Sequence, residues 1–461
     1  MERTVYQRLL EWKDSSVRKP LVLLGARQVG KTYILKEFGR NKFKNIVYIN
    51  CDNNSFTDTL FRDFDIQRII HAIEVNYEVK VEIGQTLIFF DEIQEAKGGV
   101  ASLKYFCEDM RDLHVVAAGS LLGLALREDE NFPVGKVNTI KMYPMTFTEF
   151  LLAMGRSQLR DAVLSADWEL LRHLHDLLTE MLRQYYFVGG MPEAVAQWVA
   201  TSDPKAAVKR EPSELAQGRP SDSWLDRVKA VRKAQKDILQ TYYLDFGKRG
   251  KTMVHRIRQV WDCIPAQLAK ENKKFIFGAI KKGARAADFE AAIQWLADAG
   301  LIYKICRVST PKYPLKFYKD NDAFKIYMLD CGLLALMSDA RPQDMLLGDN
   351  AFTEFKGAFT ESYFLQELVG IGGIPAYYYS KDNSTLEIEF LVQYDGQVFP
   401  CEVKAEQNVK AKSLRTFVAN EFPELNLHGL RFSMLPYADQ GWMENYPLSG
   451  IAGRFHPQEE D

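Results

Sequence analysis

The feature that most constrains the fold of this 461-residue chain is a short run of residues near its start. Residues 21–24 are apolar and predict a short buried strand. Residues 25–32 fit the pattern G-x-x-x-x-G-K-[ST], and residues 33–38 place their apolar side chains at helical spacing. A strand, a glycine-bracketed loop and a helix are the context in which this pattern binds phosphate. We therefore predict a phosphate-binding loop, although a chance glycine-rich turn before a helix would also fit the letters.

The residue types in this loop suit a bound polyphosphate. Gly25 and Gly30 would let the backbone turn tightly, so that its N–H groups surround an anion. The helix that follows adds the partial positive charge of its N-terminus. Lys31 would reach the β- and γ-phosphates of ATP, and the Thr32 hydroxyl would ligate Mg²⁺. The predicted ATP-binding residues are Gly25, Ala26, Arg27, Gln28, Val29, Gly30, Lys31 and Thr32.

Two further predicted strands end in polar residues that suit the same chemistry. Residues 87–90 are apolar and lead into Asp91 and Glu92. Residues 114–118 form another apolar run, and Ser120 follows it. We expect Asp91 to hold Mg²⁺ directly or through water, Glu92 to orient and polarise the attacking water, and Ser120 to sense the γ-phosphate. The alternatives are that an Asp-Glu pair caps a helix and that Gly-Ser forms an ordinary turn.

The composition is that of a soluble globular protein, with 47% hydrophobic and 26% charged residues. A net charge of −2 gives no overall attraction to nucleic acid or membrane, and no apolar run approaches the length of a membrane span. The six cysteines are scattered without a C-x-x-C pair, which argues against a disulfide framework and a zinc site. The first ten residues indicate a charged amphipathic helix rather than a signal peptide. We expect a cytoplasmic protein.

The length of the chain predicts two to four domains. The alternation of strands and helices occupies residues 1–141, the first expected domain. Residues 142–250 look helical, with a Gly-Gly-Met-Pro-Glu break at 189–193 and a polar, proline-containing linker near 201–224. We expect this second region to be a helical lid and connector.

Residues 251–318 predict a winged helix-turn-helix. A helix begins near 257–261, a second is expected over 275–280, and a third over 286–296 is followed by a strand at 301–308. The cationic residues ahead of the third helix are Lys270, Lys273, Lys274, Lys281, Lys282 and Arg285, opposed by Glu271. They could contact nucleic-acid phosphates. Such a run is more often a solvated face, and winged helices also bind proteins.

The C-terminal region, residues 319–461, contains a second group of charged residues. The pattern predicts a helix containing Glu361, then two strands joined by a turn at Asp395-Gly396. Strand alternation puts Glu387 and Glu389 on one face of the first strand. It also puts Glu402 and Lys404 on one face of the second. Two carboxylates that hold Mg²⁺ and a lysine that activates water would form a restriction-nuclease-like site. Spacing alone favours the alternative, an ordinary half-buried hairpin with a charged face.

With these residues considered together, the chain resembles the bacterial and archaeal AAA-type ATP-binding proteins whose C-terminal domain of unknown function has a restriction-nuclease-like core. Besides the phosphate loop and Phe90-Asp91-Glu92, the resemblance rests on residues 143–150, 189–193, 327–334, 387–391 and 402–404. It implies ATP binding, hydrolysis and a C-terminal fold of the PD-(D/E)xK type. It also implies that Glu361, Glu389, Glu402 and Lys404 share one site.

Two parts of the family pattern do not transfer directly. Glu389 stands where the nuclease motif more often has Asp, and its longer side chain could displace a metal. An arginine supplied in trans, as in AAA rings, cannot be assigned, and Arg127 is a positional candidate alone. The expected fold class is α/β, with an AAA-type P-loop sheet, a helical lid, a winged helix-turn-helix and a C-terminal restriction-endonuclease-like α/β domain.

The leading functional hypothesis is a Mg²⁺-dependent ATPase that couples its nucleotide state to the C-terminal module. The first alternative is an ATP-regulated, Mg²⁺-dependent DNA nuclease. The second is a nucleotide-dependent binding switch that does not hydrolyse ATP. The partners that the sequence suggests are ATP, DNA through the winged-helix and C-terminal regions, and a protein. No membrane partner is expected, and the oligomeric state stays open.

Overall fold

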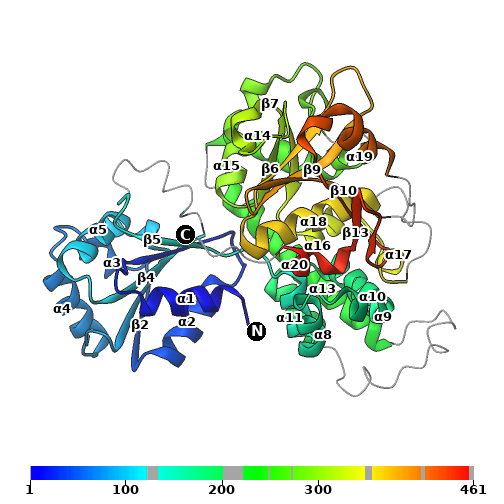
Figure 1. Ribbon diagram of the computed structural model, residues 1–461. Helices are drawn as coiled ribbons and strands as arrows, with labels where there is room; N and C mark the ends of the chain where they lie inside the picture. Colours follow the sequence, from blue (N-terminus) through cyan, green and yellow to red (C-terminus); the bar gives the residue numbers. More distant parts are fainter. Residues whose placement is uncertain are drawn as a thin grey trace. The chain divides into compact units, whose positions relative to one another are not determined.

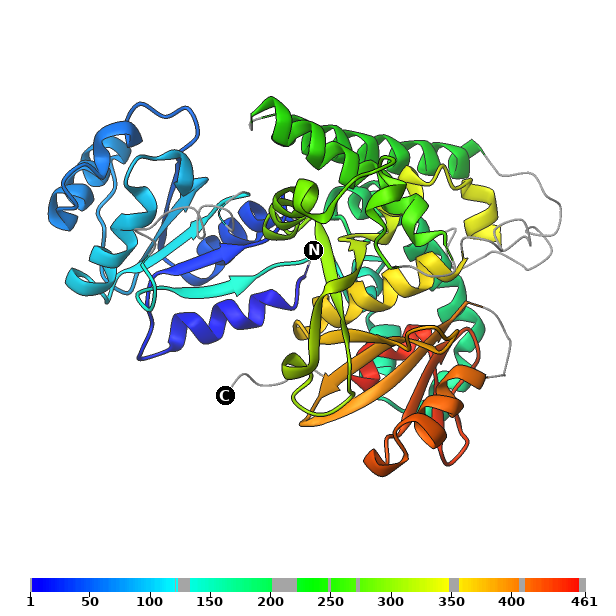
Figure 2. The same cartoon turned by 90° about the horizontal axis from the view of Figure 1, so that it is seen from above.

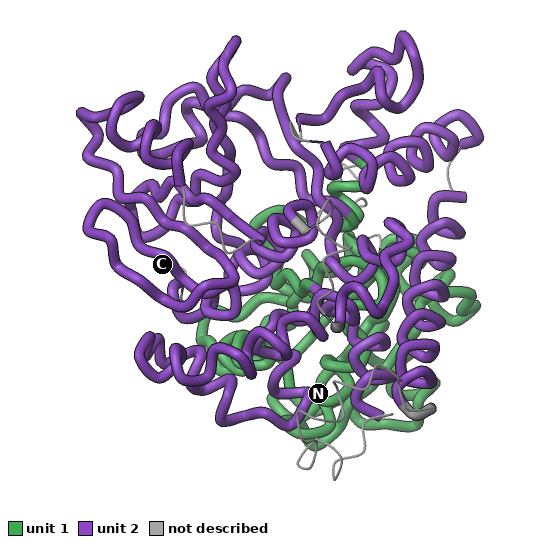
Figure 3. Tube along the Cα trace, turned by 90° about the vertical axis from the view of Figure 1, so that its right-hand side faces the viewer, with its two compact units in different colours: residues 1–143, 295–301 green, residues 144–294, 302–461 purple. Residues whose placement is uncertain are grey.

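A computed structural model describes residues 2–120, 122, 133–200, 222–247, 250–270, 274–347, 356–405 and 411–455. The chain forms two compact units (Figure 3). The first unit comprises residues 1–143 with 295–301, and the second comprises residues 144–294 with 302–461. The helical region expected over 142–250 therefore belongs, from residue 144 onward, to the same unit as the C-terminal part. Most of the linker expected near 201–224 lies outside the described residues.

The first unit is built on one parallel sheet of five strands (Figure 1). In spatial order the strands are β2 (Asn45–Asn50), β3 (Thr86–Asp91), β4 (His114–Ala118), β1 (Leu21–Leu24) and β5 (Asn138–Lys141). Every neighbouring pair is parallel, so the prediction of a parallel α/β sheet is confirmed. Because β4 lies between β1 and β3, the segments that follow these three strands meet at one edge of the sheet.

Helices cover both faces of this sheet (Figure 2). Val22 and Leu24 join a core formed with α4 (Ile66–Tyr77) and α5 (Gly99–Asp109). Leu21 and Leu23 alternate with them along β1 and are also fully buried. The remaining helices and turns are α1 (Val5–Asp14), α2 (Lys31–Lys42), α3 (Thr57–Leu60) and η1 (Ile93–Glu95). Burial on both faces explains why the strands read as continuous apolar runs.

The second unit contains a mixed eight-stranded sheet. Its spatial order is β12 (Ala438–Asp439), β13 (Met443–Pro447), β11 (Gly429–Ser433), β10 (Gln397–Lys404), β9 (Glu387–Tyr394), β8 (Ala376–Ser380), β6 (Ile302–Val308) and β7 (Lys319–Met328). The hairpin of β9 and β10 turns at Asp395-Gly396, where the sequence predicts it. Helix α18 (Lys356–Gly372) contacts β10 and β7, and α19 (Lys412–Thr416) contacts β9 and β10.

The second unit contains further helices. They are α7 (Phe147–Ala153), α8 (Ser157–Leu164), α9 (Trp168–His173), α10 (His175–Val188), α11 (Pro192–Ala200), α13 (Asp222–Phe246), α14 (Lys251–Leu268), α16 (Cys331–Met337), α17 (Pro342–Leu347) and α20 (Ile451–Arg454). Helix α15 (Ala286–Asp298) begins in the second unit, and its residues from 295 onward are assigned to the first. In the described part of the chain, no helix is both long and apolar enough to cross a membrane.

The prediction of a helix over residues 275–280 is wrong in extent. Only a single 3-10 turn forms there, η3 (Phe277–Ala279). The Phe275 N–H donates to the Phe324 carbonyl of β7, and the two rings stack with their centroids 5.6 Å apart. This attachment to β7 holds the start of the segment outside a helix. The order of helix, turn, helix and hairpin is that expected of a winged helix, and the assignment stays a prediction.

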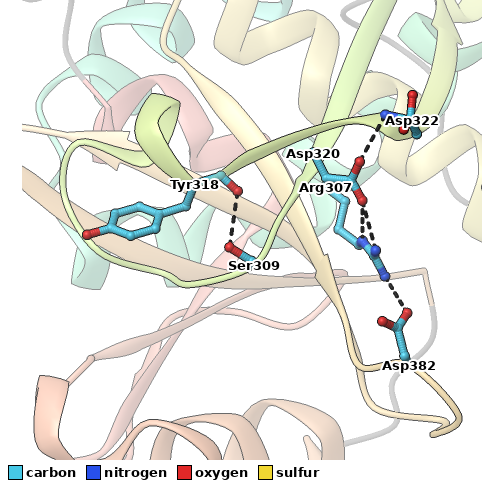
Figure 4. Close-up of polar contacts among 6 residues, drawn as sticks. All are labelled: Arg307, Ser309, Tyr318, Asp320, Asp322 and Asp382. Carbon is cyan, nitrogen blue, oxygen red and sulfur yellow. Dashed lines mark hydrogen bonds and ion pairs between the residues drawn. The ribbon is translucent and has the colours of Figure 1, made fainter.

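The boundary expected at residue 318 also differs from the structure. A domain boundary at residue 318 would separate β6 from β7, but these two strands form an antiparallel hairpin. On its other side β6 pairs with β8. Arg307 joins the three strands, because its guanidinium donates to Asp320 at 2.8 Å and to Asp382, just after β8, at 2.5 Å (Figure 4). The hairpin is therefore part of the C-terminal sheet, through pairing distant in sequence.

Candidate functional site

The loop over residues 25–32 connects β1 to α2, as the sequence predicts. Gly25 has φ of 150°, and a Cβ there would lie 2.2 Å from the carbonyl oxygen of Met142. Gly30, the residue before α2, has φ of 98°. Both positions therefore require glycine, one for space and one for a left-handed backbone. We call residues 25–32 the P-loop from here on.

Lys31 occupies the interior of the P-loop. Its ammonium donates to the carbonyl oxygens of Gly25 and Ala26, each at 2.8 Å. Burial lowers the pKa of Lys31 to about 8, although the carboxylates of Glu92 and Asp91 act in the opposite direction. Within the described residues this ammonium forms no ion pair, and its hydrogen bonds go to neutral carbonyl groups.

Asp91 ends β3 beside the P-loop. Its Oδ2 accepts hydrogen bonds from the Thr32 hydroxyl at 2.8 Å and from the Tyr48 hydroxyl at 3.1 Å. Burial raises the pKa of Asp91, and these two hydrogen bonds partly offset that effect. A hydroxyl and a carboxylate are oxygen ligands of the kind that Mg²⁺ prefers. The predicted pair, Thr32 and Asp91, is thus brought together. Tyr48 was missed, because nothing in the pattern of β2 distinguishes it.

Glu92 follows Asp91 with a left-handed backbone, at φ of 51°. Its Oε2 accepts from the Gln94 amide at 2.6 Å. It also accepts from the Ser120 N–H at 3.0 Å and from the Ser120 hydroxyl at 3.2 Å. Ser120 therefore lies at the predicted edge, but its hydroxyl is engaged with Glu92. Gln94 was missed, although its place two residues after the Asp-Glu pair could have drawn attention to it.

Arg3 is a further residue that the sequence did not single out. Its guanidinium donates to the carbonyl oxygen of Val29 in the P-loop at 3.0 Å, and to that of Tyr143 at 2.6 Å. The residue is only 8% exposed. Two charge-assisted hydrogen bonds from a buried cation fix the back of the P-loop to Tyr143, the last residue of the N-terminal segment of the first unit. One arginine in an amphipathic segment gives no signal of this role.

The predicted C-terminal site is partly assembled. The Lys404 ammonium lies 2.8 Å from Glu389 Oε1 and 3.4 Å from Glu402 Oε1. Glu361 comes from α18 and accepts from the Tyr327 hydroxyl at 2.9 Å. We call Glu361, Glu389, Glu402 and Lys404 the Lys404 cluster.

The single ammonium of Lys404 offsets part of the negative charge of the carboxylates in the Lys404 cluster. Burial works against the charged form of Lys404, but Glu389 and Glu402 together raise its pKa above the ordinary value. Burial, with the charge of Glu389, raises the pKa of Glu402 to about 7. Glu402 Oε2 is buried and has no hydrogen-bond partner among the described residues. No three His, Cys, Asp or Glu residues in the described ranges are arranged to hold a metal ion.

Three stretches that carry the family resemblance meet in a buried hydrogen-bond network of the second unit. Asp330 accepts from the Gly190 N–H at 2.6 Å, and the Met145 N–H donates to the Gly190 carbonyl at 2.6 Å. Gln366 of α18 accepts from the Cys331 N–H at 2.8 Å. A Cβ at Gly190 would lie 2.1 Å from the Met145 carbonyl oxygen. These contacts account for residues 143–150, 189–193 and 327–334 as packing motifs.

Some predicted cationic residues lie on the surface, and others cannot be placed. Lys281, Lys282 and Arg285 are exposed. Lys273, Glu271 and Arg127 lie outside the described residues.

Three segments match known family models. Residues 17–151 match an AAA domain, which includes all five strands of the parallel sheet. Residues 220–344 match a domain of unknown function, DUF8612. Residues 356–435 match another, DUF4143, which includes the Lys404 cluster.

Several solved structures show distant similarity. The Aeropyrum pernix ORC1 protein, solved in complex with DNA, is 12% identical with a TM-score of 0.32, over 74% of this chain and 93% of that one. The Aeropyrum pernix ORC2 protein in its ADP form is 13% identical with a TM-score of 0.31, over 75% and 92%. Cdc6p from Pyrobaculum aerophilum is 12% identical with a TM-score of 0.24, over 75% and 95%. Similarity this low carries no argument about function.

No match to a curated protein was found. The parallel sheet, the P-loop geometry and the family match agree with one another. Residues 17–151 are therefore an AAA-type P-loop domain, followed in the same chain by two segments that match domains of unknown function.

Proposed function

We propose that this protein is a Mg²⁺-dependent ATPase whose reaction takes place at the P-loop. The observation that carries the proposal is the meeting of Lys31, Thr32, Asp91 and Glu92 at one edge of the parallel sheet. A cation and two carboxylates lie close together there without pairing with each other. ATP, which brings negative phosphates and a divalent cation, would complement both kinds of charge.

Binding would exchange partners at Lys31. Two carbonyl groups accept hydrogen bonds from its buried ammonium. The β- and γ-phosphates are anionic and would form stronger, charge-assisted hydrogen bonds with it. The P-loop N–H groups and the N-terminus of α2 would hold the remaining phosphate oxygens.

Thr32 and Asp91 would hold Mg²⁺, since their hydrogen bond shows that the two oxygens already reach one point. When bound, Mg²⁺ neutralises charge on the phosphates. Tyr48 would keep its hydrogen bond to Asp91 and fix the carboxylate in place.

Glu92 would position the attacking water. All three of its hydrogen bonds from Gln94 and Ser120 reach Oε2. Oε1 is then the oxygen that would accept from water, as general-base assistance requires. For Ser120 to sense the γ-phosphate, its hydroxyl would have to leave Glu92, which would couple nucleotide binding to the orientation of this carboxylate.

Arg3 offers a route by which the nucleotide state could reach the second unit. It hydrogen-bonds both Val29 in the P-loop and Tyr143, where the chain leaves the first unit. A shift of the P-loop on ATP binding would therefore be transmitted through Arg3 to Tyr143. We propose this coupling as part of the function.

The direct test is phosphate release from ATP by the wild type and by Lys31→Ala, each with Mg²⁺ or with EDTA, and with or without double-stranded DNA. We expect turnover by the wild type with Mg²⁺ and none by the variant. Stimulation by DNA would identify an activating partner. Tight ATP binding without turnover under every condition would instead support a nucleotide-dependent binding switch.

A second candidate function is ATP-regulated DNA cleavage at the Lys404 cluster. The observation in its favour is Glu402 Oε2, a buried oxygen without a partner among the described residues. Against it, Lys404 already occupies the space between Glu389 and Glu402. Metal-dependent cleavage of DNA that disappears in Glu402→Gln, while ATP turnover survives, would establish this activity.

A further inference from the structure

The loop that joins β6 to β7 displays an unusual set of side chains. Phe317 is 83% exposed and Tyr313 is 54% exposed. Lys312, Lys316 and Lys319 are exposed beside them in sequence. We call residues 309–319 the β6–β7 tip.

The β6–β7 tip is a built structure, so the exposure of its two rings does not come from a loose loop. Leu315 is fully buried in the core of the second unit, and its N–H donates to the Gln393 side chain at 2.9 Å. The Ser309 N–H and hydroxyl donate to the Tyr318 carbonyl at 3.0 and 3.4 Å, closing the base of the tip (Figure 4). The tip thus places Leu315 in the core and leaves the rings of Tyr313 and Phe317 exposed.

The charge of the tip is positive. Residues 309–319 contain three lysines and no acidic residue. Asp320, which follows the tip in sequence, and Asp382 are both paired with Arg307. Figure 4 shows these ion pairs on one side of the strands and the Tyr318 ring directed away from them. Within the described residues, neither Lys312 nor Lys316 forms an ion pair.

We propose that the β6–β7 tip binds single-stranded nucleic acid, with bases stacked on Phe317 and Tyr313 and phosphates beside the lysines. Exposed rings interleaved with cations are the arrangement by which proteins bind single strands without sequence preference. A duplex hides its base faces in the stack, so it would use only the lysines. This site is separate from the P-loop and does not depend on the ATPase proposal.

An anionic membrane is the less favoured partner. Burying one Phe ring gives roughly 2–3 kcal/mol, and a single acyl chain, with far more buried carbon, anchors a protein only marginally. Two rings on a short tip would therefore hold a membrane weakly. Base stacking needs no more than one ring for each nucleotide.

The test measures binding of the full chain, without ATP, to labelled oligothymidylate, oligouridylate and a DNA duplex by fluorescence anisotropy. We expect Phe317→Ala to weaken binding of a single strand about tenfold, the loss of one stacked base. Leu244→Ala removes a side chain that is 68% exposed elsewhere in the same unit, and should change binding less than twofold. Thermal unfolding of both variants should match that of the wild type, since the side chains of Phe317 and Leu244 are both exposed.

The lysines are tested by the dependence of binding on salt. Lys316→Gln should reduce the slope of log affinity against log salt by about 0.7, the value for one lost phosphate contact on a single strand. Lys236→Gln, an exposed lysine on α13, should leave the slope unchanged. Comparison of the two oligonucleotides separates DNA from RNA as the natural ligand.

Three outcomes would overturn the proposal. The first is that the wild type binds neither oligonucleotide. The second is that Phe317→Ala binds a single strand as the wild type does. The third is that phosphatidylserine vesicles bind the tip and oligonucleotides do not, which would make the tip a membrane contact.

Discussion

The two units each bring a lysine close to carboxylates, yet they arrange these charges in opposite ways. At the P-loop, Lys31 is held by carbonyl oxygens, and Asp91 by the hydroxyl groups of Thr32 and Tyr48. In the Lys404 cluster, the ammonium lies directly between the carboxylates of Glu389 and Glu402.

We infer from this difference that the P-loop is the better prepared of the two sites for an ionic ligand. A polyphosphate and its cation can enter the P-loop by displacing neutral hydrogen-bond partners. A metal ion entering the Lys404 cluster must first break ion pairs in a partly buried place, which leaves charges unpaired and is costly. The comparison teaches that the presence of acids and a lysine is a weaker indication of catalysis than the way in which they are paired.

The largest effect is expected from removing the P-loop cation. Lys31→Met should weaken ATP binding by about 100-fold, because two charge-assisted hydrogen bonds to phosphate are lost. Lys404→Met should leave ATP affinity unchanged. Isothermal titration calorimetry measures the ATP affinity of both variants. Equal losses of affinity would contradict the difference drawn between the two sites.

The next effect concerns stability rather than binding. Lys404→Met should lower the free energy of unfolding of the second unit by about 2 kcal/mol, since two partly buried carboxylates lose their counter-ion. Lys381→Met breaks a more exposed pair with Glu421 and should cost less than about 1 kcal/mol. Urea unfolding measures both. A stable Lys404→Met variant would mean that the cluster does not depend on its internal ion pairs.

The pH dependence of ATP binding should show a smaller change. Burial lowers the pKa of Lys31 to about 8, so the ammonium persists at pH 7 and is mostly lost at pH 9. Bound phosphate favours the charged form. The dissociation constant should therefore rise about tenfold between pH 7 and pH 9. A flat profile would show that Lys31 remains charged throughout this range.

The smallest expected effect is at Arg3. Arg3→Ala should raise the dissociation constant for ATP about fivefold, because the P-loop loses a charge-assisted hydrogen bond that fixes its back. Arg40→Ala, an exposed residue of α2, is the matched control and should have no effect. If Arg3→Ala binds ATP like the wild type but the second unit no longer responds to ATP binding, the role of Arg3 is coupling alone.

Local patterns account for what the sequence could predict. The P-loop, the apolar strands and the β9–β10 hairpin are each specified within a few tens of residues, and each lies where it is expected. The pairing of β6 with β8 brings Arg307 beside Tyr378, and no local pattern indicates such a distant register.

The same reason explains the site residues that were missed. Arg3 reaches across 26 residues to Val29 and 140 residues to Tyr143. Tyr48 reaches Asp91 from a neighbouring strand. Single polar residues of this kind acquire a role only when the fold brings distant segments together. Spacing could place Lys404 with Glu402, but could not show that the ammonium pairs with the carboxylates.

The central claim is that the P-loop edge carries the chemistry and that the Lys404 cluster is maintained by its own charges. The most direct measurement compares ATP binding and phosphate release for the wild type, Glu92→Gln and Glu402→Gln. We predict that Glu92→Gln binds ATP but releases no phosphate, whereas Glu402→Gln does both at wild-type levels. Normal phosphate release by Glu92→Gln, or its loss in a folded Glu402→Gln variant, would contradict this account.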